Sequence, residues 1–361
     1  MLIDLAITLV KIAIMIGGVL GLVYLLSWME RKQSAVMQDR IGANRAPILG
    51  LRMIGLFHPI ADALKLLTKE DFVPAGAYKF FHSIAPFVSL FFALVAFAAI
   101  PFGPTITIGE RVIDLQIVGF FNVGLLYLLA MMSLGMYGVI LAGWASRNNY
   151  ALMGGLRATS QMISYEVAMG SAIVGLIMVY QSLNLQEMVK AQGTMIWGII
   201  PQWGVVLQPL GFLLFLTAGI AETKRIPFDL PEGESEIIGY FIEYSGMRWG
   251  LFLTTDFVET VLISGMVTSL FFGGWQVPFL MDNGFHFGTE LIWTLSPLTV
   301  TVLRILSFAI KVFFFCWFLL LVRWTLPRFR YDQLLRLGWK VMMPLAFVNI
   351  VVTGLILVIF A

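Results

Sequence analysis

Long apolar segments alternate with shorter polar segments along the whole chain. Because a membrane-spanning helix needs about 20 mostly apolar residues, this pattern predicts about eight spans. The expected spans are residues 5–29, 80–100, 115–141, 161–180, 205–221, 249–275, 299–324 and 338–360. Pro201 and Pro209 interrupt the fifth run, so seven or nine spans stay open as alternatives. The first run has no small-residue cleavage site, and we expect it to be retained.

The pattern predicts an all-α fold without β-strands. We interpret residues 1–361 as one polytopic membrane domain of about eight transmembrane helices. Its first cytoplasmic loop covers residues 30–79, and an acidic cytoplasmic loop covers residues 222–248. Within the first span, Gly17, Gly18 and Gly21 are typical of close packing between helices.

The composition excludes a soluble protein. Hydrophobic residues make up 59% of the chain and charged residues 12%, whereas soluble domains have roughly 45–50% and about 25%. A net charge of +2 does not indicate nucleic-acid binding. Most Lys and Arg residues fall in the odd-numbered loops, which places those loops in the cytoplasm and both termini on the opposite side. We therefore expect a multi-pass protein of the bacterial plasma (inner) membrane.

The first loop contains an amphipathic segment. Its polar residues recur at helical spacing at His58, Asp62, Lys65 and Lys69, and apolar residues fill the other face. The segment is too short and too charged to span, so it predicts a helix at the cytoplasmic membrane surface. Two roles stay open: a membrane anchor, or one wall of a lipid-accessible cavity.

The fifth loop concentrates acidic residues beside basic ones. Its acids are Glu222, Asp229, Glu232, Glu234, Glu236 and Glu243, and its bases are Lys224, Arg225 and Arg248. The simplest interpretation is a solvated acidic patch or a docking face for a basic partner. The interleaved prolines and aromatic residues instead favour a loop that folds back against the membrane. Clustered carboxylates in such a setting are desolvated and repel one another, which raises their pKa and allows them to pass protons.

Four further ionisable residues fall within the expected spans, at Glu166, Asp256, Glu259 and Lys311. An ionisable group at the bilayer centre costs about 2.5–3.5 kcal/mol on insertion scales, so these residues are functional candidates. One interpretation is mutual neutralisation, for example of Lys311 with an acid of the sixth span. The other is a hydrated polar track from Glu166 and Asp256 to the fifth loop, as a proton relay requires.

Redox and metal chemistry within this chain is not expected. Cys316 is the only cysteine, and the three histidines are scattered. The chain therefore has no set of residues for an iron–sulfur cluster or a metal ion, and any redox centre must sit on a partner.

Four motifs in the same order resemble one known family. They are ERKQSAVMQDRIGANR at residues 30–45, NYALMGGLRATSQMISYE at 149–166, ETKRIPFDLPEGESE at 222–236 and PRFRYDQ at 327–333. Together they resemble the H-subunit family of NADH:quinone oxidoreductase, respiratory complex I. The resemblance covers essentially the whole chain.

The resemblance implies a membrane subunit that joins a redox arm to a proton-pumping membrane arm and forms the cavity for a quinone substrate. Other complex I subunits would carry FMN and the iron–sulfur clusters, and this chain would bind no cofactor. By motif position, the quinone-cavity residues are Arg31, Arg40, Asp62, Arg225, Phe228 and Arg248. The proton-path residues are Glu166, Glu232, Glu234, Glu236, Glu243 and Asp256. The family often has Glu followed by Tyr where this chain has Asp256 and Phe257, so a shorter carboxylate has to reach the path.

Two other classes of protein compete with this interpretation. Sister assemblies share the framework, such as a membrane-bound hydrogenase, a cofactor F420 dehydrogenase or a ferredoxin-driven photosynthetic relative. The intact motif at residues 232–236 and the first-loop motif favour a quinone-reducing member over a hydrogenase. A stand-alone transporter would place its binding groups in broken helices near the midplane, whereas the polar residues here concentrate in loops.

Overall fold

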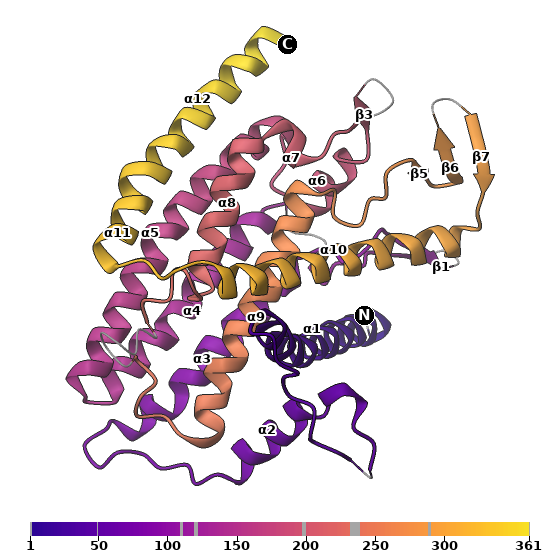
Figure 1. The fold of residues 1–361 in the computed structure, drawn as a ribbon. Helices are drawn as coiled ribbons and strands as arrows, with labels where there is room; N and C mark the ends of the chain where they lie inside the picture. Colours follow the sequence, from indigo (N-terminus) through magenta and orange to yellow (C-terminus); the bar gives the residue numbers. More distant parts are fainter. Residues whose placement is uncertain are drawn as a thin grey trace.

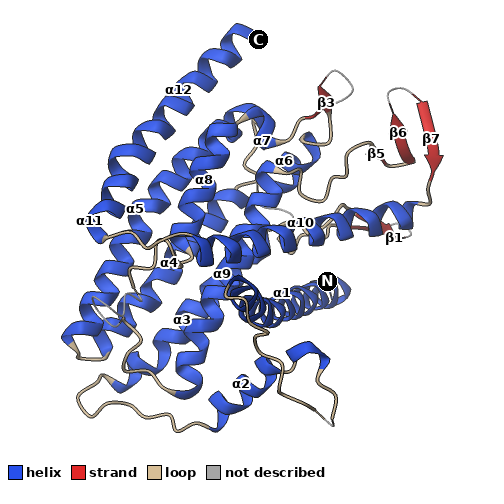
Figure 2. Cartoon of the chain, viewed as in Figure 1, coloured by secondary structure: helices blue, strands red, loops and turns tan. Residues whose placement is uncertain are grey.

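The computed structural model describes residues 2–48, 50–108, 111–118, 122–196, 200–231, 239–287 and 290–360. Helices dominate these residues, and short strands lie in the connecting loops (Figure 2). The helices are α1 (Leu2–Met37), α2 (His58–Thr68), α3 (Lys79–Ala96), α4 (Gly124–Ala145), α5 (Asn149–Tyr180), α6 (Leu185–Ala191), α7 (Gly204–Leu207), α8 (Pro209–Glu222), α9 (Gly246–Phe271), α10 (Pro297–Thr325), α11 (Tyr331–Arg336) and α12 (Met343–Phe360). The 3-10 turns η1 (Met53–Gly55) and η2 (Phe97–Ala99) and the π-helical η3 (Leu337–Met342) complete the set.

The polytopic all-α fold is confirmed. Among the described residues, seven segments are long and apolar enough to cross a membrane: Ile3–Met37, Lys79–Ala99, Gly124–Ala145, Asn149–Tyr180, Gly246–Phe271, Pro297–Thr325 and Tyr331–Ile359. The expected fifth span breaks at Gln208, where α7 ends and α8 begins with Pro209. Proline suits this first helical position because its missing N–H is not needed there. The resulting α8 is an apolar helix of 14 residues, shorter than the other spans.

The connecting loops contain strands that the sequence pattern did not predict. Strand β1 (Ile106–Ile108) pairs with β2 (Arg111–Ile113), and β3 (Met195–Ile196) pairs with β4 (Ile200–Pro201). Strands β5 (Leu280–Met281), β6 (Gly284–Phe287) and β7 (Glu290–Thr294) form a third antiparallel sheet. The expectation of no strands is therefore wrong for these loops, because their backbone polar groups pair locally in short hairpins. The third span is also shorter than expected, since α4 begins at Gly124.

Helix α9 forms the centre of the helical bundle. In its most apolar stretch 89% of the residues are buried, against 22% in α1. Helices α1, α3, α8 and α10 pack against it, and α10 crosses it in Figure 1. Because α9 meets protein on nearly every side, its polar residues are shielded from lipid.

The odd-numbered loops meet at one end of the bundle. Hydrogen bonds join the other three to the fifth loop, from Ser245 to Glu70, from Asn148 to Glu243 and from Phe329 to Pro227. This shared end agrees with the charge pattern, which assigns all four loops to one side of the membrane.

Helix α2 forms as the amphipathic pattern predicts. The hydroxyl of Tyr24 and the indole of Trp28, both on α1, donate to backbone carbonyls of Leu56 and Ile54 just before α2. Within the described residues the apolar face of α2 stays exposed, with Leu64 58% and Leu67 62% exposed. Such a face suits a membrane surface or a partner.

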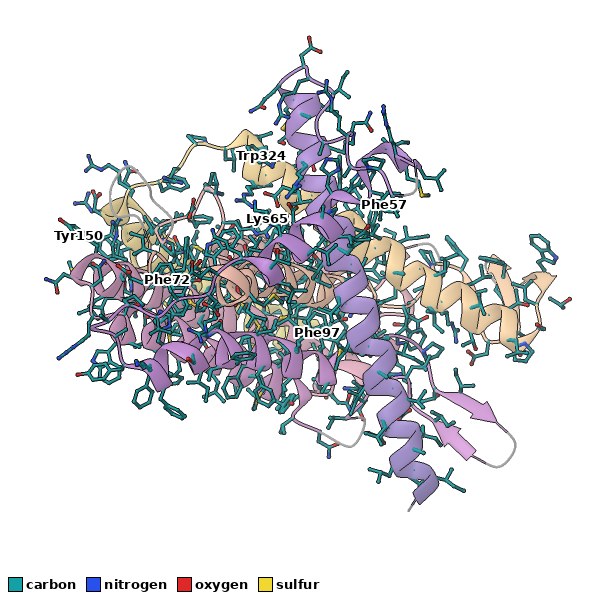
Figure 3. The ribbon with its side chains drawn as sticks, turned by 90° about the horizontal axis from the view of Figure 1, so that it is seen from below. Phe57, Lys65, Phe72, Phe97, Tyr150 and Trp324 are labelled. Carbon is teal, nitrogen blue, oxygen red and sulfur yellow. The ribbon has the colours of Figure 1, made fainter. Side chains whose placement is uncertain are left out.

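Helix α1 lies at the edge of the bundle, and its N-terminal half extends beyond it (Figure 3). A Cβ atom built on Gly17, Gly18 or Gly21 would meet nothing within 4 Å. The expected close helix packing at these glycines is therefore wrong within the described part of this chain. The glycines line an open face of α1 instead.

Candidate functional site

A buried ion-pair cluster joins the fifth loop to α9. The ammonium of Lys224 lies 3.2 Å from Oδ1 of Asp256 and 3.1 Å from Oε2 of Glu259. The three side chains are only 3%, 11% and 9% exposed. A buried charge left without a partner is strongly destabilising, so these groups stabilise one another as a unit. The cluster contains two carboxylates and one ammonium.

Local structure explains why these three side chains meet. Asp256 and Glu259 lie three residues apart on α9, which places both carboxylates on one helix face. Lys224 follows the last turn of α8 with φ of 54°, a left-handed conformation that non-glycine residues rarely adopt. Burial alone lowers the pKa of Lys224, but the carboxylates of Glu259 and Asp256 outweigh burial and raise that pKa well above its usual value. Lys224 is therefore a fixed positive charge at neutral pH.

A third carboxylate, that of Glu222, lies beside the cluster. Glu222 and Glu259 both line a cavity of about 10 Å³ between α3, α4, α8 and α9, which is the size that holds a single water molecule. Glu222 is 2% exposed and lies within electrostatic reach of Glu259 and Glu166. Glu166 accepts a hydrogen bond from Ser133 of α4. The structure thus groups carboxylates from α5, α8 and α9.

Arg225 cross-links the elements around this cluster. Its guanidinium lies 4.1 Å from the centre of the Phe257 ring and 3.6 Å from Glu30 of α1. Glu30 also binds Arg323 of α10 at 2.6 Å. The predicted quinone-cavity residue Arg225 is therefore buried where α1, α9, α10 and the fifth loop meet.

Phe228, another predicted quinone-cavity residue, is also buried. Its ring centre lies 5.4 Å from that of Tyr165 and 5.5 Å from that of Phe329. The side-chain amide of Gln161 donates to the carbonyl of Phe228 at 2.6 Å. Helix α5 therefore holds this part of the fifth loop against the bundle.

The end of the fifth loop carries two more predicted residues. Glu243 accepts a hydrogen bond of 2.7 Å from Asn148, before α5. Arg248 of α9 lies 3.1 Å from Asp71 of the first loop. Tyr244 lies between Glu243 and Arg248 in the sequence, and burial raises the pKa of its hydroxyl above the usual value. The first, third and fifth loops are thus connected by charged and polar groups.

The first loop holds the remaining predicted quinone-cavity residues. Arg31 and Asp62 form an ion pair between α1 and α2, with side chains 40% and 37% exposed. Arg40 lies apart from this pair and lines an open hollow of about 780 Å³. The other basic residues that line the hollow are Arg45, Arg52 and His58. The structure thus places Arg40 in a basic, accessible region, in contrast to the buried Arg225.

Lys311 has a different environment from the one expected. Its ammonium donates to the carbonyls of Phe272, Gly274 and Gln276 at 2.9, 3.0 and 2.6 Å. The expected pairing of Lys311 with Asp256 or Glu259 is wrong, because Lys311 contacts the turn that follows α9, whereas the two acids lie near the middle of that helix. Carbonyls at a helix C-terminus lack intrahelical donors and attract positive charge, and Lys224 neutralises the acids instead.

Some predicted residues of this region lie outside the described part of the chain, and some residues of the cluster were not predicted. Glu232, Glu234 and Glu236, which were predicted for the proton path, lie outside the described residues. Sequence reasoning missed the pairing of Lys224, although its place in an acidic loop was a usable signal. It also missed Glu30, since no local pattern connects it with Arg225. In the described part of the chain, no group of three or more His, Cys, Asp and Glu side chains could hold a metal ion.

Fold and site together define a multi-pass membrane protein that holds a cluster of ionisable groups inside its helical bundle. A sequence model of the family described as NADH dehydrogenase matches residues 10–354. The chain therefore belongs to the NADH dehydrogenase family.

Relatives that align over nearly the whole chain agree with this assignment, and three of them are H-subunits of NADH-quinone oxidoreductase. The chain is 45% identical over 355 residues to the one from Geobacter metallireducens, an alignment that covers 98% of this chain and 97% of the relative. It is 43% identical over 335 residues to the one from Cytophaga hutchinsonii, 92% of either chain. It is 42% identical over 357 residues to one from Rhizobium meliloti, 99% of either chain. With its apolar helices and bacterial relatives, the chain is a multi-pass protein of a bacterial inner membrane.

Proposed function

We propose that this chain is a membrane subunit of an NADH-quinone oxidoreductase, where it forms part of the quinone site and passes protons through buried carboxylates. Relatives with that name align over nearly the whole chain, which supports a role for all of it. The observation that carries the proposal is the cluster of Lys224, Asp256 and Glu259 inside the bundle.

The charge balance of this cluster suits proton uptake. When both carboxylates are ionised, these three groups together carry one excess negative charge, and uncompensated charge is costly in a buried site. One added proton neutralises the cluster and leaves Lys224 paired with the other carboxylate. Glu222 and the cavity beside Glu259 extend the proposed path toward Glu166. Protons would thus reach the inside of the bundle without leaving an isolated charge.

The quinone site is assigned to the first and fifth loops. The proposed residues are Arg31, Arg40, Asp62, Arg225, Phe228 and Arg248, and the proposed proton path consists of Glu166, Glu232, Glu234, Glu236, Glu243 and Asp256, extended by Glu222 and Glu259. Guanidinium groups favour the negative charge that develops on quinone oxygens during reduction. Electrons would come from FMN and iron–sulfur clusters on partner subunits. This chain would supply binding groups and protons.

The test is to purify the tagged chain with its partners from native membranes and to assay NADH-dependent quinone reduction and proton uptake into proteoliposomes. We expect Glu259→Gln to assemble and to lower both rates by about tenfold, equivalent to about 1.4 kcal/mol in barrier height. Glu187→Gln is the matched control, because Glu187 is exposed and bonds to Ser182 away from the cluster.

Three outcomes would contradict the proposal. Coupled turnover by Glu259→Gln at the wild-type rate would remove the cluster from the proton path. Co-purification with nickel-containing subunits without NADH activity would instead support the hydrogenase class. Recovery of an active transporter from the chain alone would contradict a role within a larger assembly.

A further inference from the structure

An apolar cleft of about 400 Å³ lies between the N-terminal half of α1 and the helices α9 and α10. Figure 3 shows this half of α1 leaving the bundle, near the labelled Phe97. The residues that line the cleft include Gly18, Leu22, Phe97, Ile100, Ile305 and Phe308. Its rim is open to the surroundings, since Ile14 on α1 is 70% exposed. The volume lies within the range of about 300–1,000 Å³ that is common for ligand sites.

Lys11 is the one charged residue among the described residues that line this cleft. Its ammonium donates a hydrogen bond of 3.4 Å to the carbonyl of Gln116. An ammonium has three N–H donors, so the group can bind an anion while it keeps this contact. The cleft therefore combines a long apolar surface with a single positive charge.

We propose that the cleft binds a membrane phospholipid with an anionic headgroup, which places its phosphate on Lys11 and an acyl chain along α1, α9 and α10. The match is one of charge and polarity: a phosphate complements the ammonium, and hydrocarbon complements the apolar walls. A lysine side chain reaches toward the membrane surface while its methylene groups remain in apolar surroundings. The lipid thereby covers Gly18 of α1, where no described residue lies within 4 Å of a built Cβ atom.

The position of the cleft separates it from the proposed quinone site. Lys11 lies near the start of α1, and Arg31 near its end, about 30 Å away along a straight helix. The cleft includes Val261 and Gly265 of α9, beyond the turn that carries Asp256 and Glu259. The lipid site therefore does not depend on the proposed function.

The test uses the purified assembly with its native partners in vesicles that contain phosphatidylglycerol with a photoreactive acyl chain. We expect cross-links to peptides of α1 and α10 that line the cleft. Gly18→Phe should lower this labelling by about tenfold, because the ring fills the cleft and a Cβ at Gly18 meets nothing within 4 Å. Gly17→Phe is the matched control, since Gly17 is equally open but does not line the cleft.

The charge of Lys11 is tested separately. Lys11→Gln should remove the preference for phosphatidylglycerol over a zwitterionic phosphatidylcholine probe, and Lys11→Arg should keep it. Equal labelling of the Gly17 and Gly18 variants would overturn the proposal. Labelling by an isoprenoid quinone probe in place of the lipid, or cross-links to another polypeptide across the cleft, would overturn it too. This test measures labelling and not enzyme turnover. A failure of the proposed quinone reduction would therefore leave its result unchanged.

Discussion

Two lysines contact the central helix α9 at different levels, and they meet opposite kinds of partner. Near the middle of α9, Lys224 binds the carboxylates of Asp256 and Glu259 at 3.2 and 3.1 Å. At its C-terminal end, Lys311 binds backbone carbonyls, the shortest contact being 2.6 Å to Gln276. One site contains full charges of both signs, whereas the other contains one full charge and several dipoles.

The difference indicates which part of α9 is suited to chemistry. The carbonyls around Lys311 cannot take up protons, so this lysine supplies hydrogen bonds to the turn that follows α9. The carboxylates around Lys224 can be protonated, so each of them can lose its negative charge by binding a proton. A buried charge can thus take part in proton transfer only if its partners can gain or lose a proton. Burial alone does not give a charged residue this role.

The largest effect is expected from Lys224→Met. This change leaves Asp256 and Glu259 buried without their direct ion-pair partner, and breaking a buried ion pair in this way costs roughly 3–5 kcal/mol. We expect the assembled, membrane-extracted protein to be lost, as measured by its yield in native gels. Adding Asp256→Asn and Glu259→Gln to the same chain removes the unpaired charges and should restore assembly. If the single variant assembled at the wild-type level, the three side chains would not depend on one another for stability.

A smaller loss of stability is expected from Lys311→Met. The carbonyls lose a donor, which costs about 1–3 kcal/mol where they are shielded from water, but no charge is left unpaired. The protein should assemble and unfold at a lower temperature, as measured by thermal unfolding in detergent. Lys190→Met serves as control because Lys190 is exposed on α6, which packs against the C-terminal part of α9. A loss as severe as that of Lys224→Met would remove the distinction between the two sites.

The comparison also shows how far sequence reasoning reaches. Most of the spans follow from the length of the apolar runs, and the amphipathic helix and the shared face of Asp256 and Glu259 follow from periodicity, because both signals are local. The partner of the acids does not, because it depends on the depth of each residue in the bundle. Lys311 looked suitable as an ionisable group within a span, whereas Lys224 reaches α9 through a left-handed turn after α8.

The candidate quinone-site residues illustrate the same limit. Motif position singled out Arg31, Asp62 and Arg225, and the structure pairs the first two across α1 and α2. It buries Arg225 against Glu30 and Phe257, which no spacing along the chain could have revealed. Contacts between elements follow from tertiary packing, and the sequence pattern of each element alone does not determine them.

The smallest effect is expected on the unfolding temperature when the pH is raised above about 7, because Lys224 should keep its proton there. Its carboxylate partners raise its pKa above the usual value of about 10.4. A raised pKa means that the stability contributed by Lys224 is fully present below the unfolded-state pKa and is lost as the pH rises through the higher folded-state pKa. Wild type and Lys224→Arg, whose guanidinium does not lose its proton, should therefore change unfolding temperature in parallel from about pH 7 to about pH 9. A fall of wild type relative to the arginine variant within this range would show that Lys224 releases its proton there. In that case Lys224, and not only its carboxylate partners, would exchange protons in the cluster.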